Sequence, residues 1–289
     1  MISTPSTDHP LRTMILDGRF FQLSENETLR LISLEYASEL ERLQSAYSIP
    51  GPHRSHSELP SPSFRIYHTE YDEVNRTLVG VLALRWIHFN DYDSFVGSQP
   101  DSVKLRPESF DWICRFYQRT IQSNEDLFTL VTSMIVNDLG KDPSLAIDYA
   151  KLTGTDISRV NHDMILYQVL HHPTASTRLV PSLAKITSQH KSEFLAGIKL
   201  GAEFNFGQLA QAENVPASLS GLKTDLRNNP RAFEMRFMEQ LLDIAGAAGH
   251  IDHTCARKLT EPIFDSYKNM YDVAIGIISG VLGSVKAMI

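Results

Sequence analysis

The feature that most constrains the fold is a series of apolar residues at helical spacing, which runs through the chain after residue 107. No stretch shows the sustained alternation of apolar and polar residues that is typical of a half-buried strand. The connections in this part are short and are marked by Gly, Pro or Asn. The expected helices span residues 108–121, 125–138, 144–152, 157–171, 178–200, 205–213, 231–250 and 259–285. The sequence therefore predicts a mostly α protein.

The first 107 residues have a different organisation. Residues 1–20 are polar without periodicity and are expected to form a loose arm, and the Pro- and Ser-rich segments 48–63 and 90–107 are expected to be loops. Between them, a helix is expected from Ser24 to residue 44, and an apolar run at 77–89 is expected to form a buried helix. We therefore predict two parts, an N-terminal extension (1–107) packed on the core and a helical domain (108–289).

Composition and charge exclude several classes of protein. The net charge is −7 with neutral histidines, which argues against binding to nucleic acid, because that requires a surplus of Lys and Arg. Two cysteines fit a reducing compartment, and the N-terminus lacks the features of a signal peptide, so a cytoplasmic location is expected. An uncharged run at 273–285 has only 13 residues, whereas a membrane helix needs about 20. No membrane anchor is predicted, and this run is expected to pack on the protein or to form a homodimer.

The segment IVNDLGK (135–141) ends an apolar helical run with an acidic residue. A carboxylate in such a position must be paired, hydrogen-bonded or bound to a metal if it is buried. Gly140 is expected to allow the chain to reverse after Asp138. Lys141 has two interpretations, namely attraction of an anionic substrate group or a solvated position at the end of a helix, where its charge is favourable.

Two histidines follow on apolar segments that are predicted to be helical. His162 opens NHDMILYQVL, and His190 lies in AKITSQHKSEF. A lone histidine on such a helix is more often a hydrogen-bonded core residue than a ligand. Together with Asp138, however, these histidines supply the carboxylate and imidazole groups that iron, manganese and zinc accept.

A late segment, EQLLDIAGAAGHIDH (239–253), supplies three further candidates. Asp243 lies beside small alanine residues on the apolar side of a predicted helix, and its alternative role is that of a surface carboxylate. His250 and Asp252 follow near the expected helix end. Their alternative roles are a helix cap, a partner of the helix dipole or an Asx turn.

These motifs carry a resemblance to a known superfamily. IVNDLGK resembles the HDLGK or HDIGK motif of the HD-domain metal-dependent hydrolases and oxygenases. VNHDMILYQVL resembles the GHDEYLYQVL-type segment of myo-inositol oxygenase, whose histidine is an iron ligand. Asp138 precedes His162 by 24 residues and His190 follows after 28, which is closer to the compact phosphonate-cleaving HD oxygenases. The resemblance covers about residues 115–255.

The chain departs from the superfamily pattern at two positions. Asn137 replaces the histidine of the HD pair, and no histidine lies between His88 and His162, where the pattern places one. An amide oxygen is a weaker ligand than imidazole for a transition metal. Both departures concern metal ligands, so they bear directly on whether the resemblance extends to the metal.

The resemblance implies an HD-domain-like helical bundle that binds iron, as one or two ions, and acts on a small-molecule substrate as an oxygenase. The implied ligands are Asp138, His162, His190 and either Asp243 or Asp252. The alternatives are a metal-dependent hydrolase and a metal-free or degenerate HD fold that binds a small molecule or a protein. A further alternative is a metal-free enzyme in which a His–Asp pair, either His250 with Asp252 or His162 with Asp163, does acid–base work.

Overall fold

The computed structural model describes residues 10–47, 59–203 and 229–279. All regular elements within these ranges are helices, which confirms the prediction of a mostly α protein. The N-terminal helices are α1 (Pro10–Leu16), α2 (Glu25–Glu35), α3 (Ala37–Ser45), α4 (Pro62–Tyr67), α5 (Asp72–His88) and α6 (Tyr92–Val96). Those that follow are α7 (Pro107–Thr120), α8 (Asn124–Val136), α9 (Pro143–Thr153), α10 (His162–His171), α11 (Pro173–Leu179), α12 (Ser188–Glu203), α15 (Pro230–Gly246) and α16 (Glu261–Ile278).

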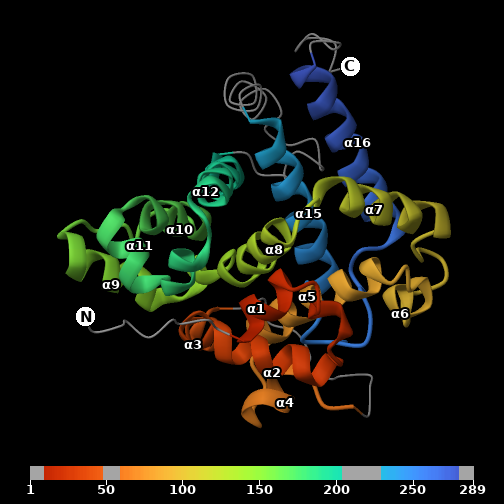
Figure 1. The fold of residues 1–289 in the computed structure, drawn as a ribbon, viewed down its shortest axis with the longest axis horizontal. Coiled ribbons are helices and arrows are strands. Elements are labelled where there is room, and N and C mark those ends of the chain that lie inside the picture. The colour runs from red at the N-terminus through yellow and green to blue at the C-terminus, as the bar shows by residue number, and fades with distance from the viewer. Residues whose placement is uncertain (1–9, 48–58, 204–228, 280–289) are drawn as a thin grey trace.

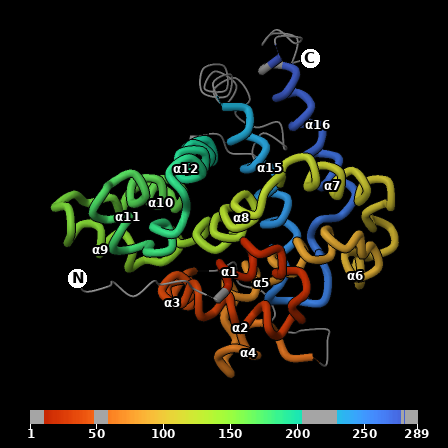
Figure 2. Tube along the Cα trace, viewed as in Figure 1, coloured from red at the N-terminus to blue at the C-terminus, as the bar shows by residue number. Residues whose placement is uncertain are grey.

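Helix α8 crosses the middle of the molecule (Figure 1). In this view α9, α10 and α11 lie together on one side, and α7 and α16 lie on the other. The tube in Figure 2 shows the N-terminal helices α1, α2 and α3 grouped on a third side, with α1 packed against α8. One hydrophobic cluster extends through all of these parts, from Leu11 to Ala274. The domain boundary at residue 107 stays a prediction, and residues on both sides of it contribute to this cluster.

Several helices differ from the sequence-based expectation. Residues 10–20, which belong to the expected loose arm, form α1 and the start of a short 3-10 helix (Phe20–Gln22), and they bury Leu11, Ile15 and Phe20 completely. Helix α6 lies in a predicted loop, and α4 begins at the end of the other one; the side chains of Asp91 and Ser61 cap them. These helices have seven residues or fewer, too short for a periodic pattern to be visible in the sequence.

Other differences concern where helices begin and end. The expected helix 178–200 is divided, because Pro173 begins α11 and Pro181 begins a separate 3-10 helix before α12 starts at Ser188. Proline favours the first turn of a new helix and disfavours a helical conformation in the residue before it. The expected helix 205–213 lies outside the described residues.

The backbones of α5 and α15 approach each other closely. A Cβ atom added to Gly80 would lie 2.9 Å from the carbonyl oxygen of Leu242, and one added to Gly246 would lie 2.1 Å from that of Arg76. A side chain at either position would force the two helices apart and break the packing between them, so only glycine fits at this contact. The contact brings the first turns of α5, with their charged side chains, next to the second half of α15.

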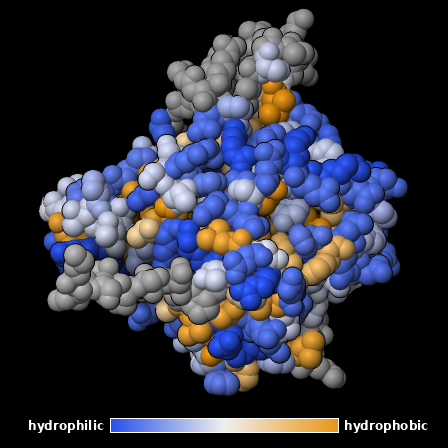
Figure 3. All heavy atoms as spheres, in the orientation of Figure 1, coloured by the Kyte–Doolittle hydropathy of each residue, from blue (hydrophilic) through white to orange (hydrophobic). Residues whose placement is uncertain are grey.

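The surface gives little indication of an extended apolar face. In the orientation of Figure 3, hydrophilic residues cover most of the visible face and the apolar ones form small separate groups. Exposed large apolar side chains such as Leu34, Phe89 and Ile147 lie on different helices or at their ends, and single exposed apolar residues are normal for a protein surface. Across 10–47, 59–203 and 229–279, none of the helices has the length and apolar character needed to span a membrane.

The glycine contact leads to a stability prediction. We expect Gly246→Ala to lower the free energy of unfolding by about 1–3 kcal/mol or more, because the added methyl group meets backbone atoms that cannot yield. Gly197→Ala is the matched control, since its Cβ would meet its nearest neighbour at 3.5 Å, an ordinary contact. That variant is expected to be neutral or stabilised by about 0.5–1 kcal/mol. Urea unfolding measures both, and equal effects would contradict the account of the α5–α15 contact.

Candidate functional site

The carboxylate of Asp138 lies at the centre of a buried group of charged residues. Helix α8 ends at Val136, and Asp138 begins a short 3-10 helix, Leu139–Lys141. The Lys141 ammonium lies 2.9 Å from Asp138 Oδ2 and 3.1 Å from Glu73 Oε2 in the first turn of α5. The side chains of Asp138 and Lys141 are 11% and 12% exposed, and that of Glu73 is not exposed at all. Lys141 is therefore not a solvated side chain but a buried partner of two carboxylates.

Gly140 joins this group to the start of α10. A Cβ atom at Gly140 would lie 2.0 Å from the carbonyl oxygen of His162, so the two segments can meet only because residue 140 has no side chain. Gly140 is not among the described glycines that have a positive φ. Its expected role in reversing the chain is therefore corrected to one of close approach. The contact connects the two sequence motifs and places His162 near Asp138.

His162 lies at the exposed edge of the group. Its Nδ1 lies 3.3 Å from the Tyr47 hydroxyl, its Nε2 lies 3.6 Å from Asp163 Oδ1, and its side chain is 31% exposed. Asn161 caps α10 by accepting a hydrogen bond from the amide of Met164. This edge of the group is therefore accessible to solvent, whereas Glu73 is not.

Asn137 connects the group to α15. The Arg236 guanidinium donates a hydrogen bond to Asn137 Oδ1 at 2.6 Å and forms an ion pair with Glu239 one turn further along α15. Gly201 of α12 leaves room for it, because a Cβ there would lie 2.6 Å from Arg236 Nε. Asn137, at the position where the resembling motif carries a histidine, thus serves as a neutral acceptor for a buried arginine, a task that an amide oxygen performs well.

Three buried polar atoms of this group lack a hydrogen-bond partner within the part of the chain that the structure describes. They are Glu239 Oε1, Arg236 Nε and Arg76 Nε. Glu239 is 1% exposed and Arg236 is 7% exposed. Buried polar atoms in native proteins nearly always have partners, so such an exception calls for an explanation, for example a ligand or an ordered water molecule.

The group contains more carboxyl groups than permanent cations. As a result, the pKa values of the carboxyl groups differ from one another, and some are raised while one is lowered. Burial is the largest influence on Glu239 and raises its pKa to about 8, since Arg236 compensates only in part and the neighbouring carboxylates add to the effect. Burial and the charge of Asp138 raise the pKa of Asp243 to about 6, against the opposing effect of Lys141. Near neutral pH the Glu239 carboxyl is therefore largely protonated and that of Asp243 largely ionised.

Asp138 shows the opposite shift. Burial alone would raise the pKa of its carboxyl, but the charge and hydrogen bond of Lys141, together with Arg76 and His162, lower it. The same attraction from Asp138 and Glu73 outweighs burial at Lys141 and raises the pKa of its ammonium. The Asp138–Lys141 ion pair is therefore charged on both sides near neutral pH.

The structure gathers some of the residues that the sequence singled out and leaves others apart. Asp138, Lys141, His162 and Asp243 influence one another electrostatically. His190 does not join them, since its Nε2 lies 3.1 Å from Asp126 Oδ1 in the first turn of α8. Asp126 and Asp138 are 12 residues apart, or about 18 Å along a helix.

Asp252 and His250 lie in the turns that follow α15. Asp252 accepts hydrogen bonds from the backbone and side chain of Thr254 at 3.0 and 2.6 Å and pairs with Arg257 at 3.2 Å. Burial opposes its ionisation, but these donors and Ser98 lower its pKa. These contacts give Asp252 the Asx-turn role that the sequence offered as its alternative. His250 is partly buried in the same segment.

These residues do not fit a metal centre as they are arranged. Over the described ranges, no group of three or more His, Cys, Asp or Glu side chains is placed to hold a metal ion. Two of the expected ligands, His190 and Asp252, have protein partners elsewhere, and the Lys141 ammonium lies between the carboxylates of Asp138 and Glu73. The iron site stays a prediction.

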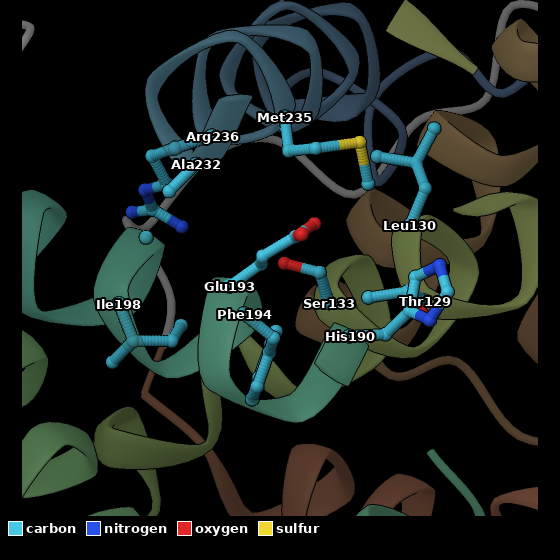
Figure 4. Close-up of a pocket in the computed structure, with 11 residues that line it drawn as sticks. Thr129, Leu130, Ser133, His190, Glu193, Phe194, Ile198, Ala232, Met235 and Arg236 are labelled. Carbon is cyan, nitrogen blue, oxygen red and sulfur yellow. The ribbon is translucent and has the colours of Figure 1, made fainter. Parts of the chain in front are cut away.

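A cavity adjoins the group at Arg236, between α8, α12 and α15. Its volume of about 20 Å³ is sufficient for roughly one water molecule. In Figure 4 the oxygen atoms of Glu193 and Ser133 point into it, with His190 and Thr129 at one end and Arg236 at the other. The full lining is Thr129, Leu130, Ser133, His190, Glu193, Phe194, Gly197, Ile198, Ala232, Met235 and Arg236.

Sequence reasoning missed half of the charged group, namely Glu73 and Arg76 on α5 and Arg236 and Glu239 on α15. Each pair is separated by three residues and forms an ion pair across one helical turn. Opposite charges at this spacing within an apolar helical segment were the available signal. The sequence did not reveal that the two pairs face the same interior, because that depends on the contact between α5 and α15.

Fold and site together define a helical protein with a buried network of ion pairs at the end of its central helix. Its residues 29–288 match the model of a family of unknown function, DUF6829. The chain therefore belongs to this family. Comparison with curated proteins and with solved structures yields no match.

The raised pKa of Glu239 predicts how stability depends on pH. A folded pKa of about 8 against an ordinary value of 4.5 means that Glu239 contributes stability below about pH 4.5, and that this contribution is lost as the pH rises to about 8. Glu239→Gln removes this dependence, so its free energy of unfolding should fall less steeply with pH, by up to about 1.4 kcal/mol per pH unit. Urea unfolding at several pH values measures the slope. The exposed control Glu41→Gln should keep the wild-type slope, and a wild-type slope in Glu239→Gln would refute the assignment.

Proposed function

We propose that this protein is an HD-like helical enzyme that binds a small anionic molecule beside Arg236 and transforms it by acid–base chemistry of its own side chains, without a metal. The observation that carries the proposal is the pair of buried, unpartnered atoms, Glu239 Oε1 and Arg236 Nε, within the described part of the chain. The sequence left open a metal-free enzyme with a His–Asp pair, and the proposal keeps the metal-free chemistry but assigns it to Glu239 and Asp243 instead. The order of the motifs around Asp138 and His162 supports the HD-like part.

Arg236 supplies the anchor for the anionic group. Its side chain is 7% exposed, the residue lines the cavity, and only part of the donor capacity of its guanidinium is used by Asn137 and Glu239. A carboxylate or phosphate oxygen is the natural acceptor for a free guanidinium N–H group. The cavity holds little more than a water molecule, so the substrate is small or the helices around the cavity separate to admit it.

Glu239 and Asp243 supply the acid and the base. They lie four residues apart on α15, and their surroundings hold them in different protonation states near neutral pH, with pKa values of about 8 and about 6. Divergent pKa values in neighbouring carboxyl groups are typical of an acid–base pair. Neither carboxyl group lines the cavity, so the proposed reaction requires the bound molecule to extend from Arg236 along α15. In that position Glu239 donates a proton to the molecule, and Asp243 accepts one from it.

The binding step is tested by ligand-observed NMR with a panel of small carboxylates and phosphate. Wild type is expected to bind at least one of them, and Arg236→Lys to bind it at least about tenfold more weakly, because an ammonium cannot reproduce the guanidinium geometry. Arg115→Lys, at an exposed position of α7, is the control and should bind as wild type does. Binding that is unchanged in Arg236→Lys, or no binding by any member of the panel, would overturn the proposal.

The chemical step is tested on the ligand that this screen identifies. Incubation in D₂O should exchange a carbon-bound hydrogen of the ligand for deuterium when the wild-type protein is present. Asp243→Asn is expected to slow this exchange about 100-fold or more, in line with the usual contribution of a catalytic base. Exchange at the wild-type rate in that variant would contradict the proposed catalytic activity and support a role in binding alone.

A further inference from the structure

A hydroxyl group, an imidazole and a carboxylate form a chain of hydrogen bonds where α12 meets α8. The Thr187 Oγ1 atom lies 2.8 Å from His190 Nδ1, and His190 Nε2 lies 3.1 Å from Asp126 Oδ1. Thr187 directly precedes α12 and is exposed, whereas Asp126, in the first turn of α8, is buried. The hydrogen bonds therefore connect a hydroxyl group at the surface to a buried carboxylate.

Asp126 is held in place and ionised by several donors. Its Oδ2 accepts hydrogen bonds from the backbone amides of Gln122 and Ser123 at 3.0 and 2.8 Å, and Arg231 pairs with its Oδ1. Burial opposes ionisation of this carboxyl group, but the donors outweigh it and lower its pKa. Because a carboxylate only accepts hydrogen bonds, the His190 nitrogen that contacts it, Nε2, must carry a proton.

His190 is thereby held in the form that can deprotonate a hydroxyl group. In the neutral imidazole with its proton on Nε2, Nδ1 carries no proton and accepts the hydrogen bond of the Thr187 hydroxyl. A hydroxyl group, a base within hydrogen-bond reach and a carboxylate that orients the base are the arrangement of a nucleophilic triad. Such a triad also needs donors for the developing oxyanion. The first amide groups of a helix have no carbonyl partner within it, and those of the 16-residue helix α12 follow Thr187 directly.

We propose that this protein hydrolyses carboxylic esters at the start of α12, with Thr187 as the nucleophile, His190 as the general base and Asp126 as the residue that positions His190. The Thr187 oxygen bonds to the carbonyl carbon of the ester, and its proton passes to His190 Nδ1. The imidazolium then gives this proton to the alkoxy group, so the alcohol leaves and an acyl-threonine remains. Water, deprotonated by His190 in the same way, releases the acid and restores the hydroxyl group. This inference does not depend on the proposed function.

The experiment measures the hydrolysis of 4-nitrophenyl acetate and the covalent labelling of the protein by a fluorophosphonate, a reagent that reacts with activated hydroxyl groups. Wild type is expected to hydrolyse the ester, and mass spectrometry of its peptides should find the label on Thr187. Thr187→Val and His190→Gln should each lower the rate about 100-fold or more, because each removes a member of the triad. Thr187→Ser keeps the hydroxyl group and should keep both the hydrolysis and the label.

A matched control separates this reaction from hydrolysis by other surface groups. Thr177 is also an exposed threonine on a helix, but its hydroxyl donates a hydrogen bond to the Pro173 carbonyl oxygen at 2.9 Å instead of to an imidazole. Thr177→Val should therefore hydrolyse the ester at the wild-type rate and keep the label on Thr187. Both valine variants replace an exposed side chain with one of the same shape, so both are expected to fold, and circular dichroism checks this.

The role of Asp126 is tested through the position of the imidazole proton. Nitrogen NMR of wild type should show the neutral His190 ring protonated at Nε2 and not at Nδ1. Asp126→Asn removes the carboxylate that fixes this form, so the ring should populate both forms and the rate of hydrolysis should fall about 100-fold or more.

Three results would overturn the proposal. One is wild-type protein without a label on Thr187, and another is a Thr187→Val variant that hydrolyses the ester as fast as wild type. Either result would leave the hydroxyl of Thr187 with the role of a helix cap alone. The third is a neutral His190 ring protonated at Nδ1 in wild type, because that nitrogen could not accept the proton of the hydroxyl group.

Discussion

The ammonium of Lys141, shared between Asp138 and Glu73, is the interaction on which the interior of this protein depends. It joins the end of the central helix α8 to the start of α5, two elements whose carboxylates would otherwise repel each other in a place with little water. Arg76 and Arg236 extend the same arrangement to the neighbouring acidic residues. The network therefore combines three permanent cations with a larger number of carboxyl groups, and the excess is accommodated by protonation, most clearly at Glu239.

Glycine residues determine that these charges meet. Gly80 and Gly246 let α5 and α15 touch through their backbones, Gly140 lets the start of α10 reach the end of α8, and Gly201 leaves room for the Arg236 guanidinium. At each of these positions a methyl group would collide with a neighbouring segment. The charged residues determine the chemistry of the site, and the glycine residues allow the segments that carry them to approach closely enough for the charges to meet. A substitution at either kind of position is expected to alter the site.

The sequence predicted the helical class and most of the long helices because apolar residues recur at helical spacing over many turns. It also identified Asp138, Lys141, His162 and Asp243 as special, since a charged or imidazole side chain within an apolar helical segment must have a partner. It could not predict α1, α4 or α6, which are too short to show a period. It also gave no indication that His190 binds Asp126 in the first turn of α8, because this depends on how α12 packs against α8.

Asn137 has a structural role in this arrangement. Its Oδ1 accepts a hydrogen bond from Arg236, so the amide at this position has a partner within the chain. Arginine and lysine thus occupy the surroundings in which the resemblance to HD-domain enzymes would place metal ions. The family of unknown function to which the chain belongs can be searched for the same pairing of residues.

The most direct test of this account is the metal content of wild-type protein purified without chelators, measured by elemental analysis together with the Tm before and after treatment with EDTA. We predict iron, manganese and zinc each well below one equivalent, and a Tm that EDTA does not change, because the cations of the site belong to the chain. About one equivalent of a metal, absent from an Asp138→Ala variant and needed for the wild-type Tm, would contradict the account. That result would restore Asp138 and His162 to the role of metal ligands.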